Sequence, residues 1–203
     1  DNGNLTIGYG TSIPAADAGK YQDGITETEA DKLMREYLAN YEKTVNAFID
    51  KHSLQLKQHQ FDALISFTYN LGTSWMNNTT HTLTKAVISG ATGNDFLFAI
   101  TRWCKASGVV LSSLANRRLS EANLYLNGVY SKSIPANFRY VILYPNLDGA
   151  IADVSIHGYD STKTDTITAI AVKDGYEFLG WYTAADGGSA VTKLNAKTTI
   201  SKL

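Results

Sequence analysis

The first ten residues place a side-chain hydroxyl close to two glycines. In the segment Asp1-Asn-Gly-Asn-Leu-Thr6-Ile-Gly8-Tyr-Gly10, Thr6 carries the hydroxyl and the glycines follow at intervals of two residues. Because glycine has no Cβ atom, it lets a polymeric substrate approach the backbone closely. The segment alone is weak evidence for a site, since turn formers alternating with Leu, Ile and Tyr are also typical of an ordinary hairpin.

Histidines and the cysteine show no pattern of a metal or nucleophilic site. The four histidines share no helical face and no ligand spacing, which favours ordinary surface or core positions; they are His52, His59, His81 and His157. The single cysteine, Cys104, excludes an internal disulfide, and we interpret it as a half-buried core thiol. We therefore expect no metal and no cofactor.

Composition narrows the classes of partner. The chain has 203 residues, of which 44% are hydrophobic and 18% charged. This length and composition allow a hydrophobic core that needs no disulfide or metal ion to be stable. A net charge of −1 and the absence of a basic stripe argue against nucleic acid as a partner. No apolar run approaches the roughly 18 residues that a membrane-spanning helix needs.

The hydrophobic pattern predicts helices behind a short N-terminal hairpin, with residues 4–9 on a strand. Thr26 and Glu29 form a capping box, and apolar residues recur at helical spacing to predict a long helix over 26–49. A second helix is predicted over 56–71, where Gly72 is expected to adopt a left-handed C-terminal cap. Three more helix-length segments each end before a glycine: 80–89, 94–106 and 113–127.

The character of the sequence changes after Ile134-Pro135. Val, Ile, Thr and Tyr broken by Asp-Gly, His-Gly and Gly-Gly pairs replace the helical periodicity. The predicted fold class is therefore α+β, with a mainly α-helical domain at 1–130, a linker at 131–136 and a separate β-rich module at 137–203.

Three motifs in the helical part carry a resemblance to a known family. Leu5-Thr-Ile-Gly-Tyr-Gly10 resembles the signature hairpin of the bacteriophage lysozymes, also called endolysins or muramidases. The stretch 60–72, Gln-Phe-Asp-Ala-Leu-Ile-Ser-Phe-Thr-Tyr-Asn-Leu-Gly, looks like the core helix of that family. Arg102-Trp103, Gly108 and 114–118 look like its C-terminal helices. The motifs follow in the family's order, which implies a lysozyme-like domain.

The resemblance implies where the catalytic groups stand. Glycoside hydrolysis normally uses two carboxyl groups that flank the bond. The family pattern is a general-acid Glu, eight residues, Asp or Cys, five residues, and a Thr that helps to position the attacking water. Thr6 matches this Thr, and the Glu is expected upstream of Asp1. Asp1 stands one residue too close to Thr6 and matches the middle position only if the intervening turn is one residue shorter; otherwise it is a solvated turn residue.

The resemblance also implies substrate-binding residues. Arg117 matches the arginine that pairs with the catalytic Glu across the cleft, and Arg118 is then expected to be its surface neighbour. The alternative is that Arg117 only covers a helix face with its stem. Gly10, Thr11 and Asn70 are further candidates to meet sugar groups, although many family members carry His where Thr11 stands.

The C-terminal part resembles a second family. Residues 175–192 follow the Gly-Tyr-x-Phe-x-Gly-Trp-Tyr, Gly-Gly, Val-Thr pattern of the Listeria–Bacteroides repeat of bacterial surface proteins, which implies a small β-grasp-like module. A hairpin is predicted over 174–192. Trp181 and Tyr182 either stack on sugar or form the core of the module, and the core interpretation is favoured because a unit of this size needs large aromatic residues.

Together the resemblances imply a muramidase that cleaves the β-1,4 bond between N-acetylmuramic acid and N-acetylglucosamine in bacterial peptidoglycan. The expected location is the host cell envelope, reached by secretion or by release at lysis, with cell-surface contact through the C-terminal module. The alternative is a catalytically inactive wall-binding or phage structural protein that retains the lysozyme fold.

Overall fold

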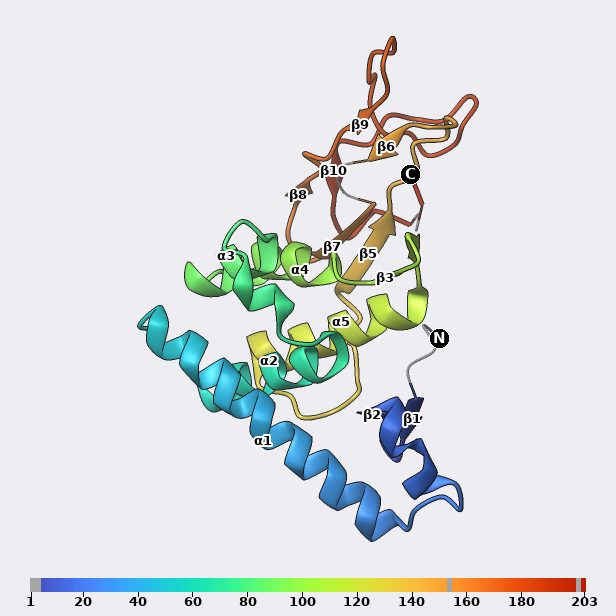
Figure 1. Ribbon diagram of the computed structural model, residues 1–203. Coiled ribbons are helices and arrows are strands. Elements are labelled where there is room, and N and C mark those ends of the chain that lie inside the picture. Colours follow the sequence, from blue (N-terminus) through green and yellow to red (C-terminus); the bar gives the residue numbers. More distant parts are fainter. Residues whose placement is uncertain (1–4, 153–154, 200–201) are drawn as a thin grey trace.

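The computed structural model describes residues 5–152, 155–199 and 202–203. Its helices lie in the N-terminal part and most of its strands in the C-terminal part, as Figure 1 shows. The predicted α+β class, with a helix-rich region followed by a β-rich region, is confirmed.

A short hairpin opens the described chain. Strand β1 (Leu5–Ile7) pairs antiparallel with β2 (Thr11–Ile13), and Thr6 lies opposite Ser12. The hairpin is as predicted, but β1 is shorter than 4–9 because Gly8 turns the chain with a φ of 57°. A 3₁₀ helix, η1 (Ala15–Tyr21), then leads toward the first long helix.

Helix α1 (Glu27–Lys51) is the longest element. Its predicted capping box is confirmed: the Thr26 hydroxyl accepts from the Glu29 amide, and the Glu29 carboxylate accepts from the Thr26 amide. One face is apolar and buries Val45 and Phe48 against the rest of the helical core.

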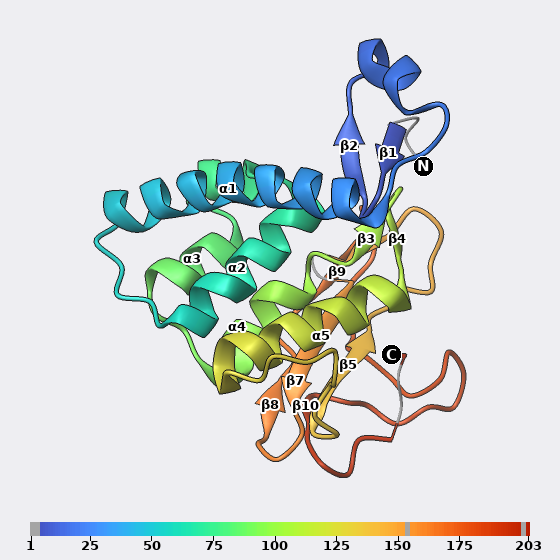
Figure 2. The same ribbon diagram turned by 90° about the horizontal axis from the view of Figure 1, so that it is seen from below.

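The remaining helices enclose one hydrophobic core. They are α2 (Gln58–Leu71), η2 (Ser74–Asn77), α3 (Thr82–Ile88), α4 (Gly93–Thr101) and α5 (Ser112–Asn127). Figure 2 shows α2 lying between α1 and α5. Phe67 and Trp75 are fully buried and meet edge to face, with ring centroids 5.8 Å apart. The Trp75 indole donates to the Thr68 hydroxyl at 3.1 Å, which satisfies its polar atom inside the core.

Two predicted helix ends need correction. Gly128 ends α5 in the left-handed conformation, as its position predicts, but Gly72 pairs a φ of 76° with a ψ of −172°, so the left-handed cap predicted there is wrong. The helix predicted over 94–106 ends at Thr101, and 105–106 instead form β3, paired with β4 (Val109–Val110). Cys104 is 0% exposed rather than half-buried, because it packs with Ala115 and Ile156. Its carbonyl accepts from the Leu111 amide beyond the β3–β4 pair, and helical periodicity encodes neither contact.

The C-terminal part is a set of paired strands. β5 (Phe138–Ile142) pairs antiparallel with β7 (Ile156–Asp160), β6 (Ile151–Ala152) with β9 (Ala171–Val172), and β8 (Asp165–Thr166) with β10 (Lys193–Leu194). The hairpin predicted over 174–192 is reduced to one antiparallel bridge between Tyr182 and Ala190, reinforced by the Val191 amide donating to the Trp181 carbonyl. Trp181 belongs to the module core, whereas Tyr182 remains 39% exposed, so the core interpretation holds for Trp181 alone.

The β-rich part packs directly on helix α4. Gly158 of β7 lies against Thr101, whose hydroxyl accepts from the Gly158 amide at 3.1 Å. A Cβ atom at Gly158 would stand only 2.5 Å from the Thr101 methyl carbon. His157 contacts the Phe98 ring at 4.8 Å between centroids, and Phe138 of β5 joins the core of the helical part. The sequence suggested a separate unit, but the two parts share buried contacts.

Candidate active site

The hairpin presents its two glycines to different surroundings. A Cβ atom at Gly8 would stand 2.9 Å from the Ala30 side chain, so Gly8 permits close packing of the hairpin on α1. Gly10 has a φ of 89° and nothing within 4 Å of a built Cβ. The open approach that the sequence suggested for both glycines is thus a property of Gly10 alone. Thr6 lies exposed on β1.

Tyr69 of α2 connects the hairpin to the helical core. Its hydroxyl donates to the Tyr9 carbonyl at 3.0 Å and lies 3.4 Å from the Thr11 hydroxyl. Tyr41 of α1 meets the Tyr69 ring edge to face, with centroids 6.1 Å apart. Thr11 is 2% exposed, and its hydroxyl faces Tyr69 and helps to hold the hairpin, so its contact with sugar groups stays a prediction.

The residue after Tyr69 enters a network between α2 and α5. The side-chain oxygen of Asn70 accepts from Arg118 Nη2 at 2.8 Å. Arg118 Nε lies 2.8 Å from one oxygen of Glu121, and its Nη2 donates to the other oxygen at 3.1 Å. Asn70 is half-buried, so the network fixes its side chain at the end of α2. Two neighbouring residues of α2 therefore contact different elements: Tyr69 binds the hairpin and Asn70 binds α5.

Arg117 joins the same carboxylate from the outer side. Its Nε donates to Glu121 at 3.0 Å, and its Nη2 donates to the Ser66 carbonyl at 3.2 Å. The Ser66 hydroxyl donates to the same Glu121 oxygen at 2.9 Å. The Arg117 side chain is nevertheless 39% exposed. A guanidinium has five N–H donors. The bonds to Glu121 and Ser66 use two of those of Arg117, so the exposed side of the group can donate to another acceptor.

The burial of the two arginines reverses one prediction. Arg118 was expected to be the surface neighbour of Arg117, but it is 0% exposed and stacks over the Phe67 ring at 4.7 Å. Burial lowers the pKa of Arg118, and the Glu121 carboxylate opposes that effect. Helix periodicity places both arginines near the core boundary, and only the packing against Phe67 and Asn70 decides which one turns inward.

Glu121 is the residue of this network that the sequence analysis missed. It follows Arg117 by four residues and Arg118 by three, which are the spacings at which helical side chains meet. That spacing was an available signal. Its carboxylate is almost fully buried and accepts from both arginines, so it serves as their internal counter-ion rather than as a group that faces solvent.

Asp1 lies outside the described residues. Among the residues described, no cluster of three or more His, Cys, Asp or Glu side chains could hold a metal ion. Across the same part of the chain, none of the helices combines the length and the apolar character needed to cross a membrane.

Comparison with known proteins identifies the class to which this architecture belongs. Residues 1–121 match the family described as Phage lysozyme, and residues 140–203 match the Listeria-Bacteroides repeat domain. The chain therefore belongs to the phage lysozyme family, as its motifs indicated, and carries a Listeria-Bacteroides repeat domain behind the lysozyme-like part.

Individual relatives are endolysins. The chain is 33% identical over 126 residues to the endolysin of Bacillus phage B103, covering 61% of this chain and 43% of that protein. It is 35% identical over 129 residues to the endolysin of Bacillus phage PZA, covering 62% and 45%. It thus spans less than half the length of these curated relatives. A solved endolysin of Escherichia coli O157:H7 phage FAHEc1 is 25% identical, with a TM-score of 0.47, covering 63% of this chain and 84% of that one.

Proposed function

We propose that this protein hydrolyses peptidoglycan as a muramidase, cleaving the β-1,4 bond between N-acetylmuramic acid and N-acetylglucosamine. The observation that carries the proposal is the family match over residues 1–121, which includes the hairpin and most of helix α5. The host cell envelope is the proposed place of action, and the C-terminal module is proposed to contact the cell surface.

The proposed chemistry divides two tasks between two carboxyl groups. A glutamic acid upstream of Asp1 protonates the leaving glycosidic oxygen, and the second group supports attack on the anomeric carbon. The family spacing puts that second group at a position just before Asp1, and Asp1 itself is the alternative if the turn that follows it is one residue shorter than usual. Thr6 positions the attacking water from β1, and the unobstructed Gly10 backbone lets the glycan lie close to the hairpin.

Arg117 is proposed to hold the general acid in place. Its guanidinium is anchored on one side by Glu121 and Ser66, and its exposed side can pair with a carboxylate across the cleft. Such an anchored guanidinium loses little side-chain freedom when it binds, because its orientation is already fixed. Asn70 is proposed to use its amide group toward sugar substituents while its oxygen remains bound to Arg118.

Reducing-end release from purified peptidoglycan tests the proposal. Residues 1–203, and the same chain extended by any residues encoded ahead of Asp1, should be compared, and the products reduced with borohydride before mass spectrometry. Muramitol at the new ends would support muramidase activity, whereas glucosaminitol would assign a different bond. Binding of peptidoglycan without any release by the extended chain would favour the inactive wall-binding protein.

A further inference from the structure

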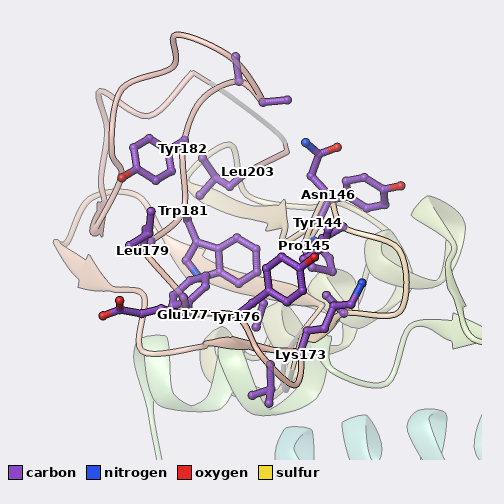
Figure 3. A pocket seen from close by; sticks show the side chains of 18 of the residues that line it. Tyr144, Pro145, Asn146, Lys173, Tyr176, Glu177, Leu179, Trp181, Tyr182 and Leu203 are labelled. Carbon is purple, nitrogen blue, oxygen red and sulfur yellow. The ribbon is translucent and has the colours of Figure 1, made fainter.

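The C-terminal module contains a pocket of about 560 Å³ that the proposed hydrolysis does not use. Its wall comes from the loop between β5 and β6, the end of β9, the segment 176–185 and the last two residues. Figure 3 shows the side chains that line it. This volume lies within the range of about 300–1,000 Å³ that small-molecule sites usually occupy.

Three tyrosines stand at the accessible rim of the pocket, beside the exposed side chains of Leu179 and Val172. Tyr144 is 53% exposed, Tyr176 is 62% exposed and Tyr182 is 39% exposed. Tyrosine combines a flat apolar ring with a hydroxyl and has few rotatable bonds, so it offers contact area at low entropic cost. Three exposed rings around one concavity are not needed for the module core, which is built from other residues.

Two of these tyrosine rings make cation–π contacts with lysine side chains. Lys202 Nζ lies 4.2 Å from the centroid of the Tyr144 ring, and Lys173 Nζ lies 5.0 Å from that of Tyr176. Lys173 also donates to the Asp148 carbonyl. Each ammonium therefore orients an aromatic ring and stands at the rim as a hydrogen-bond donor.

The floor of the pocket is rigid. Trp181 is 5% exposed, and its indole donates to the Ala169 carbonyl at 2.9 Å. Phe178 packs against it edge to face, with ring centroids 5.1 Å apart. A fixed floor beneath oriented rings is a largely pre-formed site, which reduces the entropy lost when a ligand binds.

The chemistry of the lining favours a saccharide. The C–H face of a pyranose ring carries small positive partial charges that complement the negative face of an aromatic ring, while its hydroxyl and acetamido groups need donors and acceptors at the edges. Two lysines and one glutamate, Glu177, line the pocket, so its charge balance suits a neutral or weakly anionic ligand.

We infer that this pocket, formed by Tyr144, Tyr176 and Tyr182 over Trp181, binds a segment of N-acetylated wall glycan. The choice of this glycan rests on the proposed function, whereas the existence of an aromatic ligand site does not. The site holds the chain on the wall polymer and takes no part in bond cleavage.

Titration of the full chain with chitotetraose and with peptide-free glycan strands tests the inference, using calorimetry for Kd. The double variant Tyr144→Ala/Tyr176→Ala should raise Kd by about tenfold, equivalent to about 1.4 kcal/mol. The corresponding double Phe variant should retain binding, because it keeps both rings. Tyr130→Ala removes a tyrosine that is 65% exposed on the helical part and should change Kd less than about twofold.

The outcomes separate this site from the hydrolytic one. Arg117→Ala should impair reducing-end release while it leaves binding at the tyrosine pocket intact. If the double Ala variant shows the same number of glycan-binding events with the same Kd values as the unchanged chain, or if the unchanged chain binds neither glycan, the inference is overturned whatever the hydrolytic activity. Binding of the stem peptide L-Ala-D-Glu-L-Lys in place of glycan, lost in the same variant, would also overturn the saccharide assignment.

Discussion

At the scale of single residues, two adjacent arginines on α5 share one carboxylate but face opposite environments. Arg118 is enclosed by Phe67, Asn70 and Glu121, whereas Arg117 reaches the same glutamate from a partly exposed position. Removing one partner of a buried ion pair leaves the other charge without compensation, which costs far more than breaking an exposed pair. The two positions should therefore separate stability from activity.

Arg117→Ala is expected to reduce activity much more than stability. Loss of a partly exposed ion pair should lower the free energy of unfolding by at most about 1 kcal/mol. If Arg117 positions the general acid, reducing-end release by the complete enzyme should fall at least about tenfold, with the loss in kcat rather than KM. Equal losses in stability and activity would instead show that Arg117 only covers its helix.

Arg118→Ala provides the contrasting variant. It leaves a cavity beside Phe67 and removes the donor of the Asn70 oxygen, while Glu121 keeps only Arg117 as counter-ion, so the free energy of unfolding should fall by about 2–5 kcal/mol. Urea denaturation followed by tryptophan fluorescence measures the loss. A change below about 1 kcal/mol would contradict the burial of this guanidinium.

Cys104 makes a prediction about alkaline pH. Burial raises the pKa of this thiol from 9.0 to about 11. The unfolded chain therefore loses the proton first, and stability falls as pH rises from 9 to 11, by about 1.4 kcal/mol per pH unit. Below pH 9 the contribution is fully present. Denaturation of Cys104→Ala over the same range should show a shallower fall, and an unchanged slope would contradict the assignment.

At the scale of elements, the hairpin depends on two glycines with different roles. Gly8→Ala should displace the hairpin from α1, because its Cβ would stand 2.9 Å from Ala30 and its φ is positive. Gly10→Ala adds only the backbone cost of about 1–2 kcal/mol, since the space around it is open. Hydrogen exchange of the β1 and β2 amides should therefore accelerate more in Gly8→Ala, and equal acceleration would contradict the packing argument.

Local signals predicted the elements better than they predicted their ends or the site. The capping box at Thr26 and the left-handed Gly128 lie in short stretches of sequence, so both could be identified without the fold. The end of α4 could not, because the Thr101 hydroxyl is engaged by Gly158, far along the chain. The inward turn of Arg118 likewise depends on α2, which contributes Phe67 and Asn70.

At the scale of the whole molecule, the β-rich module and the helical part should unfold together. The Thr101–Gly158 contact and the shared position of Phe138 join the two parts through buried surfaces. Gly158→Ala should lower the melting temperature, because its Cβ would clash with Thr101 at 2.5 Å and cost about 1–3 kcal/mol.

Gly19→Ala is the matched control for Gly158→Ala. No atom lies within 4 Å of a Cβ built at Gly19, so its melting temperature should stay close to that of the unchanged chain. Calorimetry should record one transition for the unchanged chain. Two resolved transitions in the unchanged chain would show that the parts fold independently.

The packing of β7 on α4 has a consequence for engineering. Endolysin parts are attractive for chimeras because a module at one end of a chain can in principle be exchanged like a cassette. Here, replacing the C-terminal module would expose Thr101 and Phe98 to solvent, because β7 contacts both residues. A graft made near 131–136 would need a redesigned α4 surface, or an incoming strand with glycine opposite Thr101, to remain soluble and correctly folded.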